Sequence, residues 1–278
     1  MTEVLVSIII PCYNDGKYIE QALQSALDQK YPYKEIIVVD DGSDQKTKQV
    51  LEKLKPKMDI FLSQENRGVV AARNRAIDIA KGTYIMTLDA DDYFDSSFLG
   101  KAVSVLDSNT EVGMVSCHAN IIDQNKNKHI QIPNGEDFNK AIFRNNVYAS
   151  LLFRKQCWKD VNGYDPNMAM GFEDWEFNIS VSKAGWNIMV IPEALFYYRV
   201  KKKSRNYNAK KHQKELRSYV FYKHKDIGVQ NYQETIAFFL NEIEDLRSII
   251  KEYQHSRSYK LGFILLKPMR VIRKIFRI

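Results

Sequence analysis

The sequence is poor in cysteine, and its few cysteines form no recognisable pattern. Cys12, Cys117 and Cys157 are an odd number, and none of them belongs to a Cys-x-x-Cys pair. A disulfide framework or a structural zinc site is therefore not expected. We interpret the three cysteines as semi-buried thiols of a protein from a reducing compartment.

Long apolar runs are absent as well. Residues 1–11 contain one short apolar run and no basic leader, which predicts a first β-strand rather than a signal peptide. No stretch is long and apolar enough to span a bilayer. We therefore expect a cytoplasmic protein, either free or peripheral on the inner face of the plasma membrane.

The motifs of two common nucleotide-binding classes are also missing. No G-x-G-x-x-G and no Walker-type glycine loop follows the first predicted strand, which argues against a dinucleotide oxidoreductase and a P-loop enzyme. The five histidines include no pair at helical spacing that would bind a metal ion. A nucleotide or metal site must therefore be built from other residues.

Positive charge is abundant only near the C-terminus. The net charge is +7, yet residues 1–198 hold 21 Lys and Arg against 27 Asp and Glu. Residues 199–226 hold 11 against 2, and residues 251–278 hold 8 against 1. Basic segments of this kind attract diphosphate, anionic lipid or nucleic acid, and the alternative is a solvated surface.

Apolar, β-branched runs alternate with helical patterns in the first half of the chain. This alternation predicts an α/β fold, with a Rossmann-like, mostly parallel sheet and helices on both faces. Strands are expected at 4–10, 35–39, 60–62, 84–88, 113–122, 149–153 and 186–191. Helices are expected at 18–29, 47–54, 69–80, 174–184 and 230–253. Polar clusters at 11–16, 40–44 and 89–92 follow predicted strands, where ligands bind in such sheets.

The acidic segment after the strand at 84–88 is the first candidate for chemistry. Asp89 and Asp91 are two residues apart, so in extended backbone both side chains project to the same side, with Asp92 beside them. A pair of carboxylates suits Mg²⁺ or Mn²⁺ shared with a diphosphate. The alternative interpretation is a solvent-exposed acidic turn.

Two further carboxylate pairs follow predicted strands or precede a predicted helix. The pair Asp40-Asp41 can accept hydrogen bonds from a base imide or a ribose hydroxyl, and helix capping by Asp41, Ser43 or Asp44 is the alternative. Either carboxylate of Glu173-Asp174 can act as a general base, and a stabilising charge at a helix N-terminus is the alternative.

These motifs occur in an order that resembles family 2 of the glycosyltransferases, which have the GT-A fold. The resemblance covers about residues 4–205. It is carried by Val6-Ser-Ile-Ile-Ile-Pro-Cys-Tyr-Asn14, Ile37-Val-Val-Asp-Asp-Gly-Ser43, Asn66-Arg-Gly-Val-Val-Ala-Ala-Arg-Asn74, Leu88-Asp-Ala-Asp-Asp92, Gly163-Tyr-Asp165, Gly171-Phe-Glu-Asp-Trp175 and Tyr197-Tyr-Arg-Val200.

The resemblance implies a role for particular residues. The nucleotide-sugar site would include Pro11, Tyr13, Asn14, Asp41, Asn66, Arg73 and Asp89, with Asp41 recognising the base and Arg73 near the donor. Asp89 and Asp91 match the family's Asp-x-Asp, with Asp91 the closer ligand of Mn²⁺ or Mg²⁺. Asp174 matches the catalytic base, and Glu173 would orient the acceptor.

One position departs from the family's pattern. After Tyr-Arg-Val many members carry a histidine that reaches the metal or the diphosphate, whereas this chain has Lys201, followed by Lys202 and Lys203. A protonated lysine cannot ligate a cation. We expect Lys201 or Lys202 to bind the donor diphosphate directly.

The resemblance implies an inverting enzyme that moves a sugar from a nucleotide-sugar, expected to be a UDP-sugar, to a saccharide or lipid-linked saccharide acceptor. Residues 1–110 would form its nucleotide-sugar-binding half, 111–225 its acceptor half and 226–278 a C-terminal helical extension. Synthesis of bacterial surface polysaccharide or glycolipid is the expected setting. A nucleotidyltransferase, a non-catalytic nucleotide-sugar binding module and, least favoured, a nucleic-acid binder remain the alternatives; a nucleic-acid partner is not expected, and homo-oligomerisation stays open.

The last segment, 257–278, is basic and amphipathic. Pro268 can start a helix, and beyond it Val271, Ile272, Ile275 and Phe276 share one face. This pattern is typical of an interfacial helix on anionic lipid. Packing against the body of the protein or against a partner chain is the alternative.

Overall fold

The computed structural model describes residues 3–123, 128–133, 135, 142–143, 145, 147–201, 209 and 211–276. It divides into two units, residues 1–224 and residues 225–278. The assignment of 1–110 to the donor, 111–225 to the acceptor and 226–278 to a C-terminal extension stays a prediction. None of the described helices is both long and apolar enough to cross a membrane.

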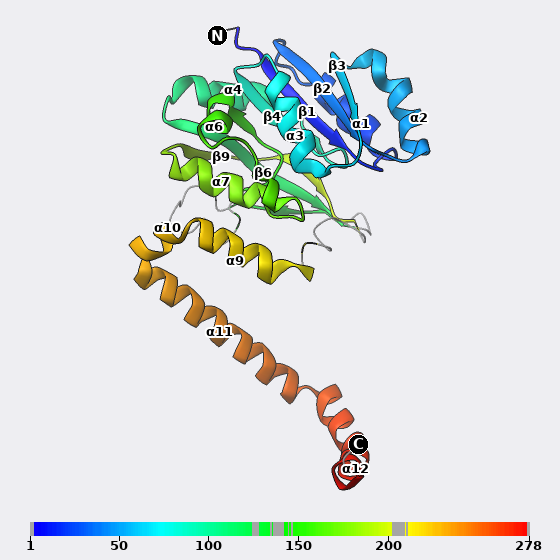
Figure 1. Cartoon of the computed structure of the whole chain (residues 1–278), viewed down its shortest axis with the longest axis vertical. Coiled ribbons are helices and arrows are strands. Elements are labelled where there is room, and N and C mark those ends of the chain that lie inside the picture. The colour runs from blue at the N-terminus through cyan, green and yellow to red at the C-terminus, as the bar shows by residue number, and fades with distance from the viewer. Residues whose placement is uncertain are drawn as a thin grey trace. The chain divides into compact units, whose positions relative to one another are not determined.

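The first unit is built on one mixed sheet with the strand order β3-β2-β1-β4-β8-β6-β9-β5, and β7 pairs with β6 (Figure 1). The strands are β1 (Val6–Cys12), β2 (Lys34–Asp41), β3 (Ile60–Gln64), β4 (Tyr84–Thr87), β5 (Tyr93–Phe94), β6 (Val112–Ile122), β7 (Lys128–Gln131), β8 (Leu152–Arg154) and β9 (Asn187–Arg199). Strands β3, β2, β1 and β4 are parallel, and β8, β5 and β7 introduce the antiparallel pairs.

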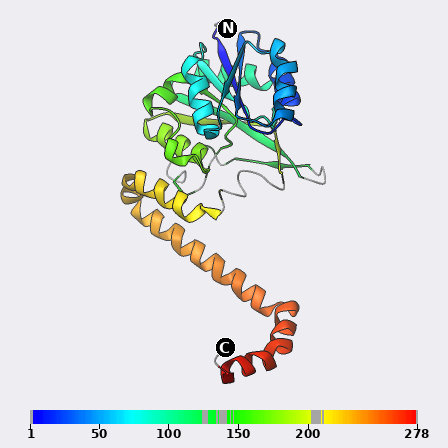
Figure 2. The ribbon, with the colours of Figure 1, turned by 45° about the vertical axis from the view of Figure 1, so that its right-hand side comes forward.

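Helices lie on both faces of this sheet (Figure 2). They are α1 (Ile19–Leu27), α2 (Gln45–Leu54), α3 (Gly68–Ile79), α4 (Phe98–Ser108), α6 (Lys155–Asp160), α7 (Glu173–Lys183) and α9 (Gln213–Lys223), with short 3₁₀ turns at Lys55–Lys57 and Pro166–Met168. The second unit contains α10 (Lys225–Gln230), α11 (Tyr232–His255) and α12 (Arg257–Phe276).

Alternation along the central strands produces two separate cores. In β1, Ile8 and Ile10 belong to one buried cluster, whereas Ile9 belongs to the other. β2 divides in the same way between Val38 and Ile37. Because successive strand residues point to opposite faces, each strand carries apolar residues throughout and needs helices on both sides. The three cysteines are buried thiols within these cores.

Two sequence predictions about proline were wrong. The first strand was expected to end at residue 10, before Pro11, but Pro11 lies inside β1. β4 pairs with β1 only as far as Ile9, so Pro11 has a neighbouring strand on one side only, where a proline is tolerated. Pro268 was expected to begin a helix, but α12 already begins at Arg257 and continues through Pro268.

Candidate active site

The acidic turn that follows β4 is the centre of the site. Asp89 and Asp91 are partly exposed and Asp92 is buried. Burial and the charge of Asp89 raise the pKa of Asp91, although Lys201 opposes this effect. Burial and the neighbouring carboxylates Asp91 and Asp89 hold the pKa of Asp92 well above its usual value. Three carboxylates this close destabilise one another's charge, so the turn favours any cation that approaches it.

Three basic residues contact this turn from other parts of the fold. Arg73 Nη2 lies 2.5 Å from Asp89 Oδ1, and Lys201 Nζ lies 2.7 Å from Asp91 Oδ2. The backbone N–H of Arg199 donates to Asp92 at 2.8 Å, and its guanidinium donates to the carbonyl of Asp91. The charges of the acidic turn are therefore balanced by groups from α3 and from the end of β9.

Arg73 joins the acidic turn to a second carboxylate pair 100 residues away. Its side chain is fully buried, and its Nη1 donates to Glu173 Oε1 at 2.8 Å while Nη2 contacts Asp89. Glu173 is also fully buried. One guanidinium thus fixes the N-terminus of α7 beside the acidic turn, which brings Glu173 and Asp174 to the same region as Asp89.

Asp174 lies in the first turn of α7 and is partly exposed. Asn145 Nδ2 donates to Asp174 Oδ2 at 2.7 Å, and Asn145 in turn accepts from Asn178 on the same helix. Phe172, directly before the helix, has a left-handed backbone with φ 60°, a strained conformation for a large side chain. An accessible, oriented carboxylate at this position suits a general base.

The residues predicted to contact the nucleotide gather at the ends of β1 and β2. Pro11 is buried in β1, Tyr13 is half exposed, and Asn14 has φ 57°. The backbone N–H of Asn14 donates to Ser43 Oγ at 3.1 Å, and its side chain accepts from the Asp44 N–H at 2.7 Å. The two loops therefore form one surface at this edge of the sheet.

Asp41 is buried at this edge and is heavily engaged by the chain. Its carboxylate accepts from Gln64 Nε2 at 2.7 Å and from the backbone N–H groups of Arg67 and Gly68 at 2.9 Å each. Asp41 thus stabilises the N-terminus of α3, while Asp44 caps α2 through the Thr47 N–H. Recognition of the base by Asp41 stays a prediction.

Asn66 is exposed on the loop between β3 and α3, next to Gly42. Gly42 has φ 74°, and a Cβ atom added there would lie 2.5 Å from the backbone nitrogen of Asn66. Only glycine fits this turn, and its absence of a side chain lets the loop that carries Asn66 approach Asp41.

Lys201 lies between two carboxylates instead of projecting into solvent. Its Nζ is 2.7 Å from Asp15 Oδ1 as well as from Asp91, and it sits 5.5 Å from the ring centroid of Tyr18. Burial would lower the pKa of Lys201, but Asp91 and Asp15 raise it above the usual value, so the ammonium stays charged. Lys202 and Lys203 lie outside the described residues.

The acidic turn does not form a complete metal cage by itself. Among the residues that the structure describes, no cluster of three or more His, Cys, Asp or Glu side chains is arranged to hold a metal ion. The side chains of Asp89 and Asp91 are 30% and 19% exposed. Two accessible carboxylates fit Mg²⁺ or Mn²⁺ that is bound jointly with substrate phosphates, because these ions commonly take only one or two protein carboxylates.

A groove of about 550 Å³ lies between α4 and residues 189–193 of β9. It contains none of the predicted site residues.

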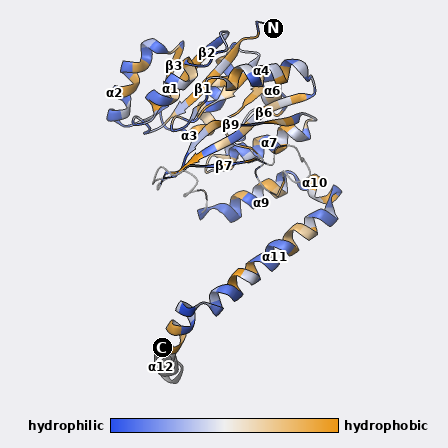
Figure 3. Cartoon of the chain, turned by 180° about the vertical axis from the view of Figure 1, so that it is seen from behind, coloured by the Kyte–Doolittle hydropathy of each residue, from blue (hydrophilic) through white to orange (hydrophobic). Residues whose placement is uncertain are grey.

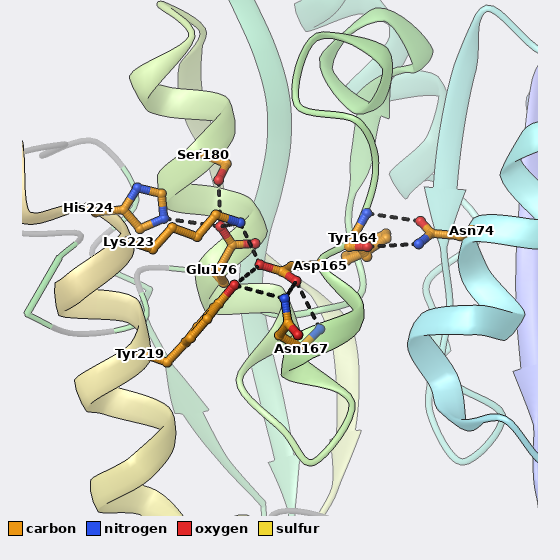
Figure 4. Close-up of polar contacts among 9 residues, drawn as sticks. All are labelled: Asn74, Tyr164, Asp165, Asn167, Glu176, Ser180, Tyr219, Lys223 and His224. Carbon is orange, nitrogen blue, oxygen red and sulfur yellow. Dashed lines mark hydrogen bonds and ion pairs between the residues drawn. The ribbon is translucent and has the colours of Figure 1, made fainter.

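Asn74 of α3 forms paired hydrogen bonds with the backbone of Tyr164 (Figure 4). Its Nδ2 donates to the carbonyl at 2.8 Å, and its Oδ1 accepts from the N–H at 2.9 Å. α3 therefore holds the segment before α7 through Asn74 and α7 itself through Arg73.

A polar network that the sequence did not reveal connects α9 to α7 (Figure 4). Lys223 Nζ lies 2.6 Å from Asp165 Oδ2 and 2.7 Å from Glu176 Oε1. His224 Nε2 lies 3.0 Å from the same oxygen of Glu176, and Tyr219 donates to Asp165 at 2.8 Å. These contacts attach α9 to α7, the helix that carries Asp174, and to the segment before it.

The carboxylates of this network have pKa values below their usual 3.8 and 4.5. Burial alone would raise the pKa of Glu176, but hydrogen bonds from His224, Lys223 and Ser180 outweigh burial and lower it. For Asp165, burial is outweighed by hydrogen bonds from Lys223, Asn167 and Tyr219. Both carboxylates therefore stabilise the fold above about pH 4.5, and this stabilisation is lost as the pH falls through their folded-state pKa values.

We expect Lys223→Met to reduce the free energy of unfolding by about 1–3 kcal/mol at neutral pH, because Glu176 and Asp165 lose a charged donor. The difference from the unsubstituted protein should shrink below about pH 4 as the carboxylates become protonated. Urea unfolding of both proteins between pH 3 and 8 measures this difference in the free energy of unfolding. Lys214→Met, at an exposed position of the same helix, is the control. A difference that does not change with pH would contradict this account.

Comparison with known proteins places these residues in a defined family. Residues 7–176 match the family described as "Glycosyl transferase family 2". The chain is 28% identical over 205 residues to poly(ribitol-phosphate) beta-N-acetylglucosaminyltransferase TarS of Staphylococcus aureus, a match that covers 70% of this chain and 35% of that relative. The chain therefore spans only about a third of the length of this relative.

Two solved structures share the fold. The structure of Staphylococcus aureus TarS residues 1–349 with UDP-GlcNAc has a TM-score of 0.60 at 23% identity, covering 72% of this chain and 60% of that one. A mannosyltransferase from Pyrobaculum calidifontis with GDP-Man and Mn²⁺ has a TM-score of 0.61 at 17% identity. This match covers 100% of this chain and 88% of that one. These similarities confirm the predicted GT-A fold.

Proposed function

Because the chain belongs to glycosyl transferase family 2 and is a glycosyltransferase, we propose that it transfers a sugar from a UDP-sugar to an acceptor hydroxyl with inversion. The proposed setting is the synthesis of a bacterial surface polysaccharide or glycolipid. The observation that carries the proposal is the Arg73 bridge, which holds the acidic turn and the N-terminus of α7 around one position.

The relatives support a nucleotide-sugar donor. TarS is solved with UDP-GlcNAc and the mannosyltransferase with GDP-Man. In this chain the joined loops at Asn14 and Asp41 would bind the nucleoside, and the acidic turn would face the diphosphate. A saccharide or lipid-linked saccharide is the proposed acceptor, approaching from the side of Asp174.

Mn²⁺ or Mg²⁺ would be held by Asp91 and Asp89, and when bound it would neutralise charge that develops on the leaving diphosphate. In the proposed reaction Asp174 accepts the proton of the acceptor hydroxyl while that oxygen forms its bond to the anomeric carbon. The bond between that carbon and the diphosphate oxygen breaks on the opposite side. Glu173 is fully buried against Arg73, so it would orient the acceptor indirectly, by holding the first turn of α7 in place, and Asn145 orients the Asp174 carboxylate.

A panel of nucleotide-sugars tests the proposal. The full chain would be incubated with UDP-, GDP- and other nucleotide-sugars, with and without Mn²⁺, while thermal stabilisation and released nucleoside diphosphate are measured. A UDP-sugar should raise the melting temperature and release UDP when an acceptor is present. A protein that binds none of the panel with either cation would not be the proposed enzyme.

Lys201→Ala gives a separate prediction about the diphosphate. We expect the dissociation constant for UDP to rise by about 10–100-fold, because a charge-assisted hydrogen bond is lost. Mn²⁺ alone should bind the variant more tightly, since the ammonium no longer occupies Asp91. Isothermal titration of each ligand measures both effects. Lys17→Ala removes an exposed charge near Tyr18 and is the control. Unchanged UDP affinity would contradict the assignment.

Binding of an anionic membrane through residues 257–278, on the inner face of the plasma membrane, is a further part of the proposal. Its support is the basic, amphipathic composition of the segment and the helix α12, which spans Arg257–Phe276. The described part of that helix exposes Leu261, Ile264 and Leu265. Apolar side chains beside basic residues suit the boundary between lipid headgroups and acyl chains.

A further inference from the structure

The helix α11 exposes apolar side chains along its length. It spans 24 residues, and none of its side chains, all of which the structure describes, is buried. Among them Ile236, Ile243, Leu246, Ile250 and Tyr253 are each at least 45% exposed. Coloured by hydropathy, the helix shows hydrophobic residues recurring between hydrophilic ones along its length (Figure 3). An exposed apolar stripe on a helix of this length marks an interaction surface.

Six of the apolar residues on α11 recur with a heptad spacing, and Leu240 and Ile249 lie beside them at e and g. In heptad positions a through g, Ile236, Ile243 and Ile250 occupy a, and Phe239, Leu246 and Tyr253 occupy d. The repeat therefore covers three consecutive heptads within one helix. This spacing is that of a coiled-coil seam, and in parallel coiled coils β-branched residues at a favour assembly of two helices.

Charges beside the seam favour a second copy of the same helix. Glu242 occupies a g position and Arg247 the e position of the next heptad. In a parallel, in-register pair, each g residue faces the following e residue of the other helix. Glu242 of each copy would therefore face Arg247 of the other copy, which gives two equivalent ion pairs.

An anionic lipid surface fits this helix poorly. Residues 227–250 hold one Lys or Arg against four Asp and Glu, so their net charge is negative, opposite to that of 257–278. The lipid would repel this segment. Arg247 and Lys251 are the two Lys or Arg residues of α11, whereas interfacial helices have a polar face rich in Lys and Arg.

We propose that α11 forms a parallel, two-stranded coiled coil with α11 of a second copy of this chain. The seam of isoleucine at a and phenylalanine, leucine and tyrosine at d is buried between the helices, and Glu242 and Arg247 fix the register. This inference concerns the second unit and is independent of the proposed transferase activity.

Sedimentation equilibrium of the full chain tests the proposal. The unsubstituted protein should sediment as a dimer. Ile243→Lys, which places a charge in the seam, should raise the dimer dissociation constant on the order of 100-fold. Ser248→Lys adds the same charge at an outer f position and should leave the dimer intact. A monomeric unsubstituted protein, or equal effects of the two substitutions, would overturn the proposal.

Charge exchange tests the register. Glu242→Lys and Arg247→Glu should each weaken the dimer, and the double substitution should restore it, because the pair is rebuilt with its signs reversed. If the double variant is weaker than either single variant, the two residues do not face one another and the proposed register is wrong.

Cross-linking tests the orientation. Tyr253→Cys places a thiol at a d position near the end of the helix, while the native cysteines Cys12, Cys117 and Cys157 are buried. Mild oxidation should join two copies through this residue in a parallel pair. In an antiparallel pair the two thiols would lie at opposite ends, so a failure to cross-link a sedimenting dimer would overturn the parallel arrangement.

Discussion

Replacing Asp174 by asparagine is expected to lower the rate constant of sugar transfer by about 10²–10⁴-fold, the usual contribution of a positioned general base. The amide keeps the size of the carboxylate and can still bond to Asn145, but it does not accept the proton of the acceptor hydroxyl. Because Asp174 is partly exposed, the fold should tolerate the change.

Three measurements together identify this role. Released nucleoside diphosphate gives the rate, isothermal titration gives donor affinity, and the melting temperature reports on folding. Only the rate should change, while donor affinity and melting temperature should stay the same. Glu52→Gln, an exposed carboxylate on α2, is the matched control and should change none of them. Loss of donor binding together with the rate would show that Asp174 holds the site together instead of serving as the base.

Replacing Arg73 by methionine is expected to destabilise the protein by about 3–5 kcal/mol, since Asp89 and the fully buried Glu173 lose their shared cation. The melting temperature should fall by roughly 6–20 °C. Arg73→Lys keeps the charge but lacks the planar fork that reaches two carboxylates at once, so its effect should be intermediate.

The same helix supplies the control for this variant. Arg75 is exposed two positions further along α3, where it donates to the Ser63 carbonyl and to Gln64. Arg75→Met removes an identical side chain without uncovering a buried carboxylate, so its melting temperature should stay close to that of the unsubstituted protein. An Arg73→Met protein that melts at the unsubstituted temperature would refute the bridging role.

The sequence predicted the first half of the fold well because its local patterns and its long-range packing agree. Fully apolar runs such as the one around Ile8 are required of strands buried on both faces, and each is followed by a periodic helix. The second half was harder to predict. β9 continues to Arg199, well beyond the expected 186–191, because pairing with β6 and β5 extends it.

Some residues of the candidate site could be predicted from the sequence, and others could not. Asp89, Asp91 and Asp174 lie in motifs that spacing and resemblance single out. Asn145 lies in a stretch without a local pattern, and its contact with Asp174 depends on how that loop packs. Lys223 and His224 looked like ordinary members of a basic segment, since the buried partner Glu176 is 47 or 48 positions away in the sequence.

Lys201 makes contacts that the sequence did not indicate. The sequence predicted that Lys201 or Lys202 replaces a histidine and binds diphosphate, whereas the structure places the ammonium of Lys201 on Asp15 and Asp91. A long flexible side chain takes its position from the charges around it, and the acidic loop at Asp15 gave no signal as a partner.

The bridge made by Arg73 has a consequence for how the enzyme comes into being. Glu173 lies 100 positions beyond Arg73, so a nascent chain that has not yet docked α7 lacks an assembled reaction centre. Under the proposed function, immature copies would leave activated sugars in the cell intact. The docking of α7 and the gain of transferase activity would then coincide, and both would depend on Arg73.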